Sequence, residues 1–303
     1  MRAPVLGDYL HATGGELSDI YSGSGTRAWT PLLRQAGLSI PATGPDEEPL
    51  LRRVRALAHV DDLERAASYR RLIVSDGPRY ETLTPREQTF ARMLFMTLWP
   101  DHGGFSSYDA GLAFLRHHPA VCLEIRQVLD VSTAGIHHVP RAIDGESDVP
   151  LLTHAQYRRE EVLAAIGFAS IKRKARGQAG GVTWNNNTGA LFVNLHKDER
   201  EFSPTTMYRD YPVSRTEFHW ESPNNTAIES DVGQRFVEQP ANGREILLFV
   251  RDRPQGDFGA APFIFLGPVD YVSHQGERPI AITWKLRRPM PIDVFESGSV
   301  VAS

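Results

Sequence analysis

Two stretches in the second half of the sequence combine aromatic rings with hydrogen-bonding side chains. Residues 202–211 read FSPTTMYRDY, and residues 218–222 read FHWES. Aromatic faces together with donors and acceptors suit a pocket for a flat polar ring, and an extruded nucleobase is such a ring. The residues that share these properties form a candidate base pocket of Tyr208, Asp210, Tyr211, His219, Trp220, Ser222 and Tyr271.

Packing is the alternative explanation for these residues, because rings fill the cores of β-sheets and polar residues cap loops. Each residue taken singly fits that alternative. The set as a whole fits it less well, since a buried polar group without a partner costs roughly 1–3 kcal/mol.

Positive side chains flank the two stretches. Residues 172–176 read KRKAR and precede the run GQAGG, while the pair Arg287-Arg288 follows the last expected strand. A charged run is usually a solvated surface, but the glycines and the nearby aromatic residues also suit contacts with phosphates. Contact with a DNA backbone is therefore expected at Lys172, Arg173, Lys174, Arg176 and Arg287.

The signatures of catalysis that we searched for are incomplete. Gly23–Thr26 lacks the lysine of a phosphate-binding loop, and no Gly-x-Ser-x-Gly motif is present. His196–Asp198 lacks one residue of the His-x-Lys pattern of phospholipase-D-like nucleases. The adjacent pairs His117–His118 and His137–His138 diverge on a helix or strand, and the single Cys122 cannot form a Cys-x-x-Cys zinc pair. We expect no catalytic residues, no metal site and no cofactor.

The composition is that of an ordinary globular protein of 303 residues, with 41% hydrophobic and 23% charged residues. A single cysteine excludes a disulfide framework and fits a reducing compartment. No apolar stretch approaches the roughly 18–20 residues of a membrane span, and the N-terminus lacks the long apolar region of a secretory signal. These features predict a cytoplasmic protein. The net charge of −4 counts mildly against binding through a broad phosphate footprint.

The first 150 residues have the patterns of helices. Apolar residues recur with helical spacing over residues 50–73. Residues 84–87, TPRE, have the threonine and glutamate of a capping box and a proline at the first helical position, so a helix is expected to begin there. Two more helices are expected over residues 106–117 and 120–129. The run HVPRAIDGESDVP, over residues 138–150, indicates a domain boundary.

One further helix is expected over residues 151–168, followed by a region of strands. Six short runs are rich in β-branched and aromatic residues and are bounded by turn-forming residues. These runs are residues 181–184, 190–196, 216–221, 245–251, 263–266 and 280–286. The segment NNNTG at 185–189 is expected to join the first two strands as a hairpin. The sequence therefore predicts an α+β protein whose second half is an antiparallel β-barrel or curled sheet.

Several blocks of the sequence resemble, in order, a bacterial domain long catalogued as being of unknown function. The blocks are LLTHAQY, LFVNL, FSPTTMYRDY, FHWES, GQR, LLFVR, FLGPVDYVSHQGERPI and ITWKL. The segments YSGSGTRAWTPLLRQAGL and LAHVDDLERAASYRRLI are similar to the helical part of the same family. The resemblance covers nearly the whole chain.

This resemblance implies a function in DNA restriction and in defence against viral DNA. The domain commonly forms the C-terminal part of large proteins with a phospholipase-D-like nuclease and a superfamily 2 helicase. Such proteins include modification-dependent (type IV) restriction enzymes, whose C-terminal domain is similar to the SRA domains that flip 5-methylcytosine out of duplex DNA. The chain is then expected to bind double-stranded DNA carrying a modified cytosine and to direct a nuclease–helicase, fused or in trans, to it.

The resemblance also implies a domain organisation. We expect a helical region at residues 1–145, an SRA-like or PUA-like β-barrel reader at 146–295 and a disordered tail at 296–303. The sequence lacks helicase motifs and a complete nuclease motif. An excised recognition region or a stand-alone reader is therefore expected, and not an enzyme.

Chemistry suggests a role for each candidate residue in such a reader. Asp210 would accept a hydrogen bond from the amino group of cytosine. Stacking on the base is expected from Tyr208, Tyr211 or Trp220. A wall for the methyl group is expected from His219, Trp220 or Tyr271. Phosphate contacts, or filling of the space left by the flipped base, are expected from Lys174, Arg209 and Arg235.

Two other classes of function stay open. The chain can be a protein-interaction or allosteric module of a helicase–nuclease that never contacts a base, with the aromatic set as its interface. It can also be an enzyme acting on a base or nucleotide. Salt separates the first alternative from a DNA reader, because a DNA reader loses affinity through counterion release as salt rises.

Overall fold

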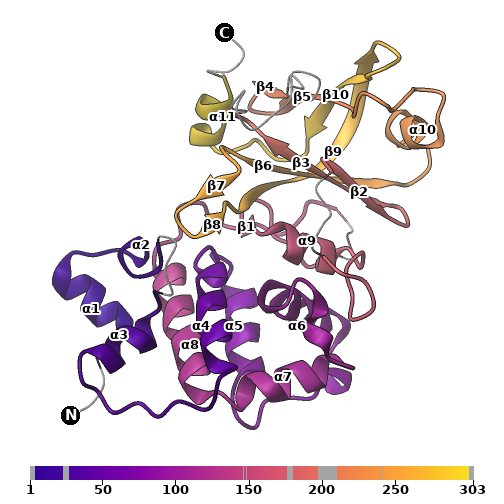
Figure 1. Ribbon diagram of the computed structural model, residues 1–303. Coiled ribbons are helices and arrows are strands. Elements are labelled where there is room, and N and C mark those ends of the chain that lie inside the picture. The colour runs from indigo at the N-terminus through magenta and orange to yellow at the C-terminus, as the bar shows by residue number, and fades with distance from the viewer. Residues whose placement is uncertain are drawn as a thin grey trace. The chain divides into compact units, whose positions relative to one another are not determined.

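The computed structural model describes residues 4–22, 27–145, 147, 149–175, 180–196, 210–239 and 241–299 (Figure 1). Contacts between Cα atoms divide the chain into two compact units. We call the first the helical unit, which comprises Met1–His137, Gln156–Gly177 and Gln255–Pro262. The second is the sheet unit, which comprises His138–Ala155, Gln178–Pro254 and Phe263–Ser303.

The helical unit is built around one long helix, α8 (Pro119–Ala134). Figure 1 shows α8 alongside α4 and α5, and α1, α3 and α7 also pack against it. The other helices are α1 (Leu6–Thr13), α2 (Leu17–Tyr21), α3 (Trp29–Gln35), α4 (Glu47–Val54), η1 (Arg55–Leu57), α5 (Leu63–Leu72), η2 (Tyr80–Thr82), α6 (Pro85–Leu98), η3 (His102–Gly104), α7 (Tyr108–Arg116) and α9 (Arg159–Ala165). The unit also contains the short strands β1 (Gln156–Tyr157), β7 (Gln255–Gly256) and β8 (Gly259–Ala260).

The helix boundaries confirm part of the sequence prediction. Thr84 and Glu87 form the expected capping box at the start of α6. The helix expected over residues 50–73 is broken in two, because the Asp62 carboxylate accepts hydrogen bonds from the backbone N–H groups of Glu64 and Arg65 and so begins α5 anew. The helix expected over residues 151–168 is wrong in its first half, where β1 precedes the short α9.

A buried carboxylate, Glu161 of α9, holds the helical unit together. Its Oε1 lies 3.2 Å from Nη1 of Arg65 and accepts a hydrogen bond of 2.9 Å from the Tyr69 hydroxyl. Its Oε2 lies 2.6 Å from Nε2 of His59 and accepts a bond from the backbone N–H of Arg158. Burial alone would raise the pKa of Glu161, but the nearby Arg65 and His59 lower it to about 2. The charge is therefore fully paired where it is buried.

A second buried carboxylate fixes α2 and α3 to α8. Glu124 of α8 accepts hydrogen bonds of 2.8 Å from the Tyr21 hydroxyl and from the backbone N–H groups of Trp29 and Thr30. Burial raises the pKa of Glu124, and these hydrogen bonds oppose the rise. The N-terminal N–H groups of α3 thus find an acceptor inside the unit.

The sheet unit contains a large mixed sheet with the strand order β2-β3-β6-β9-β10-β5-β4. Its strands are β2 (Val182–Asn185), β3 (Thr188–Asn194), β4 (Tyr211–Ser214), β5 (Glu217–Glu221), β6 (Glu245–Arg251), β9 (Phe263–Gln275) and β10 (Ala281–Leu286). Two helices complete it, α10 (Asp231–Val237) and α11 (Ile292–Ser299).

The sheet confirms the α+β class but corrects the expected antiparallel barrel. β3 and β6 are parallel, from Thr188 opposite Glu245 to Asn194 opposite Arg251. The ladder is open, with β2 at one end and β4 at the other among the described strands. Parallel neighbours need a crossover rather than a hairpin, and here the crossover carries β4, β5 and α10. The similarity to SRA or PUA barrels stays a prediction.

The core of the sheet unit lies on both faces of its central strands. β3, β6 and the first half of β9 are buried almost continuously, as is typical of strands covered on both sides. On one face, Phe236 of α10 packs edge-on against Trp220 and Trp284. On the other face, Phe249 stacks between Phe192 and Phe265. Within the described residues, no helix is both long enough and apolar enough to cross a membrane.

Replacing Glu161 by glutamine should destabilise the helical unit by about 3–5 kcal/mol, because the buried Arg65 loses its closer carboxylate and keeps only Asp61, at 3.5 Å. Urea denaturation followed by circular dichroism measures this loss. The matched control is Glu48→Gln, which removes an exposed i,i+4 pair with Arg52 and should cost less than about 1 kcal/mol. Equal losses for the two variants would contradict the structural role of Glu161.

The lowered pKa of Glu161 also predicts a dependence of stability on pH. A carboxylate whose folded pKa lies below its usual value of 4.5 stabilises the fold above that value. This contribution is lost as the pH falls from about 4.5 towards about 2. Over that window the unfolding free energy of the wild-type protein should fall more steeply than that of Glu161→Gln. Parallel curves in a pH series of urea titrations would contradict the prediction.

Candidate functional site

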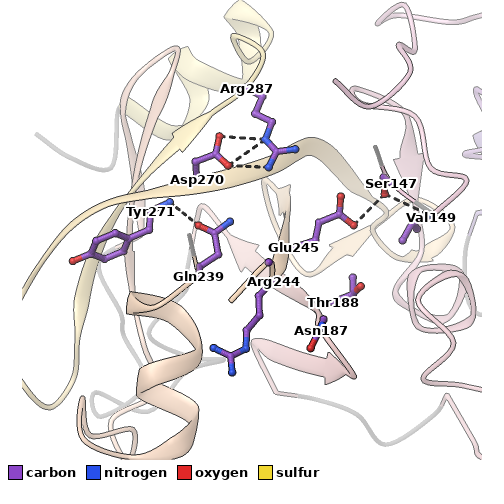
Figure 2. Close-up of a pocket in the computed structure, with 11 residues that line it drawn as sticks. Ser147, Val149, Asn187, Thr188, Gln239, Arg244, Glu245, Asp270, Tyr271 and Arg287 are labelled. Carbon is purple, nitrogen blue, oxygen red and sulfur yellow. Dashed lines mark hydrogen bonds and ion pairs between the residues drawn. The ribbon is translucent and has the colours of Figure 1, made fainter. Parts of the chain in front are cut away.

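A polar pocket of about 630 Å³ lies in the sheet unit where β6 begins (Figure 2). Its walls come from the β2–β3 turn, from the segment between α10 and β6, from the middle of β9 and from the residue after β10. This volume falls in the range of about 300–1,000 Å³ that is usual for small-molecule sites. The lining residues are Ser147, Val149, Asn187, Thr188, Gln239, Gly243, Arg244, Glu245, Asp270, Tyr271 and Arg287.

Gln239 lines the pocket and makes hydrogen bonds to β9 of the kind that a neighbouring strand would make. β6 pairs with β9 only up to Val269, which leaves the edge of β9 unpaired beyond that residue. The Gln239 side chain is almost fully buried, and its Nε2 donates a hydrogen bond of 3.0 Å to the Val269 carbonyl. Its Oε1 accepts one of 2.9 Å from the Tyr271 N–H. The carboxamide therefore satisfies one donor and one acceptor of the strand edge.

The acidic side chains of the pocket have partners. Arg287 forms a forked ion pair with Asp270, with Nη2 to Oδ1 at 2.9 Å, and its Nη1 donates to the Asp144 carbonyl. The hydrogen bond from Arg287 to the Asp270 carboxylate raises the pKa of Arg287, so the guanidinium stays charged. Across the pocket, the Ser147 hydroxyl donates to Oε2 of Glu245 at 3.0 Å. Figure 2 shows both contacts.

Arg244 differs from the charged residues beside it because its Nη1 has no hydrogen-bond partner among the described residues. Its Nη1 is buried and makes no hydrogen bond. In Figure 2 its side chain points away from the carboxylates of Glu245 and Asp270. A buried donor of this kind costs roughly 1–3 kcal/mol until an acceptor reaches it. Among the residues that line the pocket, Arg244 can therefore donate from Nη1 to a ligand or to water.

The chemistry available in the pocket is recognition of a polar ligand. The described lining offers arginine and hydroxyl donors, carboxylate acceptors and side-chain amides, but no histidine, lysine or cysteine. Across all described residues, no group of three or more His, Cys, Asp and Glu side chains could hold a metal ion. Figure 2 shows the Tyr271 ring turned away from Gln239 and Asp270, and the Tyr271 N–H is already bonded to Gln239.

The structure brings three of the predicted base-pocket residues together elsewhere, on β4 and β5. The Tyr211 ring stacks on the His219 ring with centroids 4.8 Å apart. Asp210 accepts a hydrogen bond of 3.0 Å from the Glu221 N–H, which ties the start of β4 to the end of β5. Trp220 and Ser222 are buried, Trp220 in the core and Ser222 as the acceptor for the Ile280 N–H. A role for these five residues in base binding stays a prediction, and none of them lines the pocket.

The predicted phosphate contacts are spread over both units. Lys172, Arg173 and Lys174 are exposed and belong to the helical unit. Arg235 lies on α10 with its guanidinium 5.5 Å from the centre of the Trp184 ring. Of the predicted residues, Tyr271 and Arg287 line the pocket. Arg176, Tyr208 and Arg209 lie outside the described residues.

Sequence reasoning missed Gln239 and Arg244. Neither belongs to a motif, and both lie between α10 and β6 where the sequence suggests only a connection. One available signal was the expected hairpin at residues 185–189, which the structure confirms and whose Asn187 carbonyl accepts a hydrogen bond from the Glu245 N–H. That bond places the start of β6, and hence Arg244, beside the turn.

Comparison with known proteins gives one family and one solved structure to report. Residues 151–297, just under half of the chain, match a family described as a domain of unknown function, DUF3427. This match confirms the sequence resemblance to such a domain over these residues; the SRA-like reader and the expected domain order stay predictions. No curated protein matches the chain.

The solved structure is the DNA recognition domain of the cytosine modification-dependent restriction endonuclease LpnPI. The similarity has a TM-score of 0.26 and 11% sequence identity, over 49% of this chain and 74% of that one. At this score the likeness does not establish a shared fold. The site is therefore argued from its own residues.

Replacing Gln239 by leucine should expose the edge of β9 and destabilise the sheet unit by about 1–3 kcal/mol, because two buried backbone groups lose their partners. Hydrogen exchange at the Tyr271 amide should accelerate in this variant. Gln239→Glu is the matched comparison for exchange at Tyr271, since it keeps the acceptor for the Tyr271 N–H while it replaces the donor to Val269 with a buried carboxylate. Unchanged exchange at Tyr271 in the leucine variant would show that the carboxamide does not hold this edge.

Proposed function

We propose that the sheet unit recognises double-stranded DNA carrying a modified cytosine, first of all 5-methylcytosine, and takes the flipped base into the pocket beside Arg244. The observation that supports this most is the buried, unpartnered Nη1 of Arg244 in the wall of a 630 Å³ pocket. A ligand with an acceptor at that point removes a penalty that the free protein carries. The resemblance of the sequence to modification-dependent restriction proteins supports the same choice.

The polar groups of the pocket suit the edge by which a flipped cytosine is read. That edge presents an amino donor beside ring-nitrogen and carbonyl acceptors. A guanidinium donates and never accepts, whereas a carboxylate keeps lone pairs for a further hydrogen bond after it has formed an ion pair. Arg244 can therefore donate to an acceptor of the flipped nucleotide, in its ring or in its phosphate, and a carboxylate of the pocket, that of Glu245 or Asp270, can accept from the amino group.

The energetics of flipping agree with a pocket of this kind. Extruding a base costs a few kcal/mol in lost stacking and pairing. A well-made contact between arginine and a base is worth about 1–3 kcal/mol, so Arg244 offsets a large share of that cost. The methyl group itself adds roughly 0.8 kcal/mol of apolar burial, so strong discrimination also needs the shape of the pocket.

The proposed role of the chain is to direct a nuclease–helicase to the modified DNA, and not to catalyse the cleavage itself. The pocket holds the base, and a nuclease–helicase, fused or acting in trans, cuts the marked DNA. The absence of histidine, lysine and cysteine from the described lining supports recognition, because these side chains most often serve as nucleophile or general base.

A binding titration with three duplexes of one sequence tests this proposal. The duplexes are unmodified or carry 5-methylcytosine or 5-hydroxymethylcytosine, at about physiological salt. The wild-type protein should prefer a modified duplex by tenfold or more, which is about 1.4 kcal/mol. Arg244→Gln should bring binding of the modified duplex down to the unmodified level, because flipping is no longer offset.

Two further variants locate the base. Arg253→Gln is the matched control, since Arg253 is an exposed arginine of the sheet unit that does not line the pocket. It should keep the preference. If Asp210→Asn abolishes the preference while Arg244→Gln does not, the base binds at β4–β5 instead. Equal or absent binding of all three duplexes would contradict a cytosine reader and favour a protein-interaction module.

A further inference from the structure

A second pocket, of about 500 Å³, lies within the helical unit. Three half-buried aromatic rings line it, those of Trp99, Phe105 and Phe114. The Trp99 and Phe105 ring centroids are 4.9 Å apart, and those of Phe105 and Phe114 are 5.4 Å apart. The rings meet at steep angles of 69° and 54°, so they pack edge-on or tilted against one another and do not stack in parallel. We call this site the aromatic pocket.

The turn after α6 is shaped to hold these rings. Its residues His102, Gly103 and Gly104 all have positive φ, at 58°, 60° and 75°. A Cβ added at Gly103 would lie 2.7 Å from the Phe105 ring and 3.0 Å from the Trp99 ring, so only glycine fits there. A positive φ at His102, which is not glycine, is a conformational cost that is often found at functional sites.

Unpaired positive charges lie beside the aromatic pocket. Pro100, which lines it, accepts a hydrogen bond of 3.0 Å from the Ala175 N–H. This bond holds the exposed segment Lys172–Lys174 next to the pocket wall. Within the described part of the chain, Lys172 and Lys174 have no ion pair.

Further charges of both signs lie at the pocket. From α4 come Arg52 and Arg53, and Arg52 has only an exposed pair with Glu48. The carboxylates of Asp46 and Asp101 also line the site. Counted with Lys172, Arg173 and Lys174, the cations outnumber the carboxylates by five to three among these residues.

We propose that the aromatic pocket binds single-stranded nucleic acid. Aromatic side chains that accept the faces of successive bases, next to a positive surface that follows the phosphates, are the two parts of such sites. Trp99, Phe105 and Phe114 supply the first part, and Lys172 and Lys174 supply the second. A purely apolar partner would have no use for the lysines. The inference does not rest on the pocket of the sheet unit, since its residues all belong to the helical unit.

The test uses the full chain and a fluorescein-labelled oligothymidylate of about 12 nucleotides. Wild-type protein should bind it with an affinity that falls as salt rises. The double variant Lys172→Gln/Lys174→Gln should bind about tenfold more weakly, with a salt slope shallower by about 1.4, since each phosphate contact to a single strand contributes about 0.7. The matched control is Arg27→Gln/Arg126→Gln, which removes two exposed cations of the same unit away from the pocket and should change little.

Cross-linking tests the contact between the bases and the aromatic residues directly. An oligonucleotide with 5-iodouracil should, on irradiation, attach to the peptide that contains Trp99 and Phe105, as identified by mass spectrometry. Phe105→Leu should reduce both this product and the affinity by about tenfold. Cross-links confined to other peptides, or equal affinities in the lysine variant and its control, would overturn the proposal. Neither result bears on the preference for modified duplexes, so the two proposals fail separately.

Discussion

The parallel pairing of β3 with β6 is the constraint on which the rest of the sheet unit depends. Two parallel neighbours cannot be joined by a tight turn, so the chain between them must cross over. That crossover carries β4 and β5 to the far side of β10 and then brings α10 back over the sheet. It ends at Gln239, whose carboxamide completes the free edge of β9. The pocket beside Arg244 therefore follows from the strand order.

Glu161 and Arg244 differ in whether the groups around them satisfy their hydrogen-bonding capacity. This difference separates a structural role from a binding role. Glu161 is enclosed by Arg65, His59 and Tyr69, and its lone pairs are used within the helical unit. A group satisfied in this way stabilises the fold and has nothing left for a ligand. Arg244 is the opposite case, since its Nη1 is buried with no acceptor. Proteins seldom leave such a group unpaired without a reason, and a bound ligand is one.

Local patterns in the sequence predicted the elements better than their arrangement. The capping box at Thr84 is confirmed, and so are six of the strands, because caps and β-branched runs act over a few residues. The prediction failed where contacts between residues far apart in the sequence determine the local structure. The expected long helix is interrupted, and Asp62 begins α5 as a separate helix. On either side of Asp62, Asp61 and Arg65 form hydrogen bonds with the backbone of Gln156, which is distant in the sequence. The prediction of an antiparallel barrel was wrong, because the residues of one strand do not determine which other strand pairs with it.

For the candidate site, too, the sequence predicted some features and the tertiary structure alone decided others. The sequence by itself determined the types of residue present, the turn at 185–189 and the helical and strand-rich halves, since these depend on neighbours along the chain. Only the tertiary structure decided that Trp220 belongs to the core, that Asp270 pairs with Arg287 and that Arg244 is left without a partner. The physical reason is that burial and hydrogen bonding depend on what surrounds a side chain in space. Those surroundings come from segments far apart in the sequence.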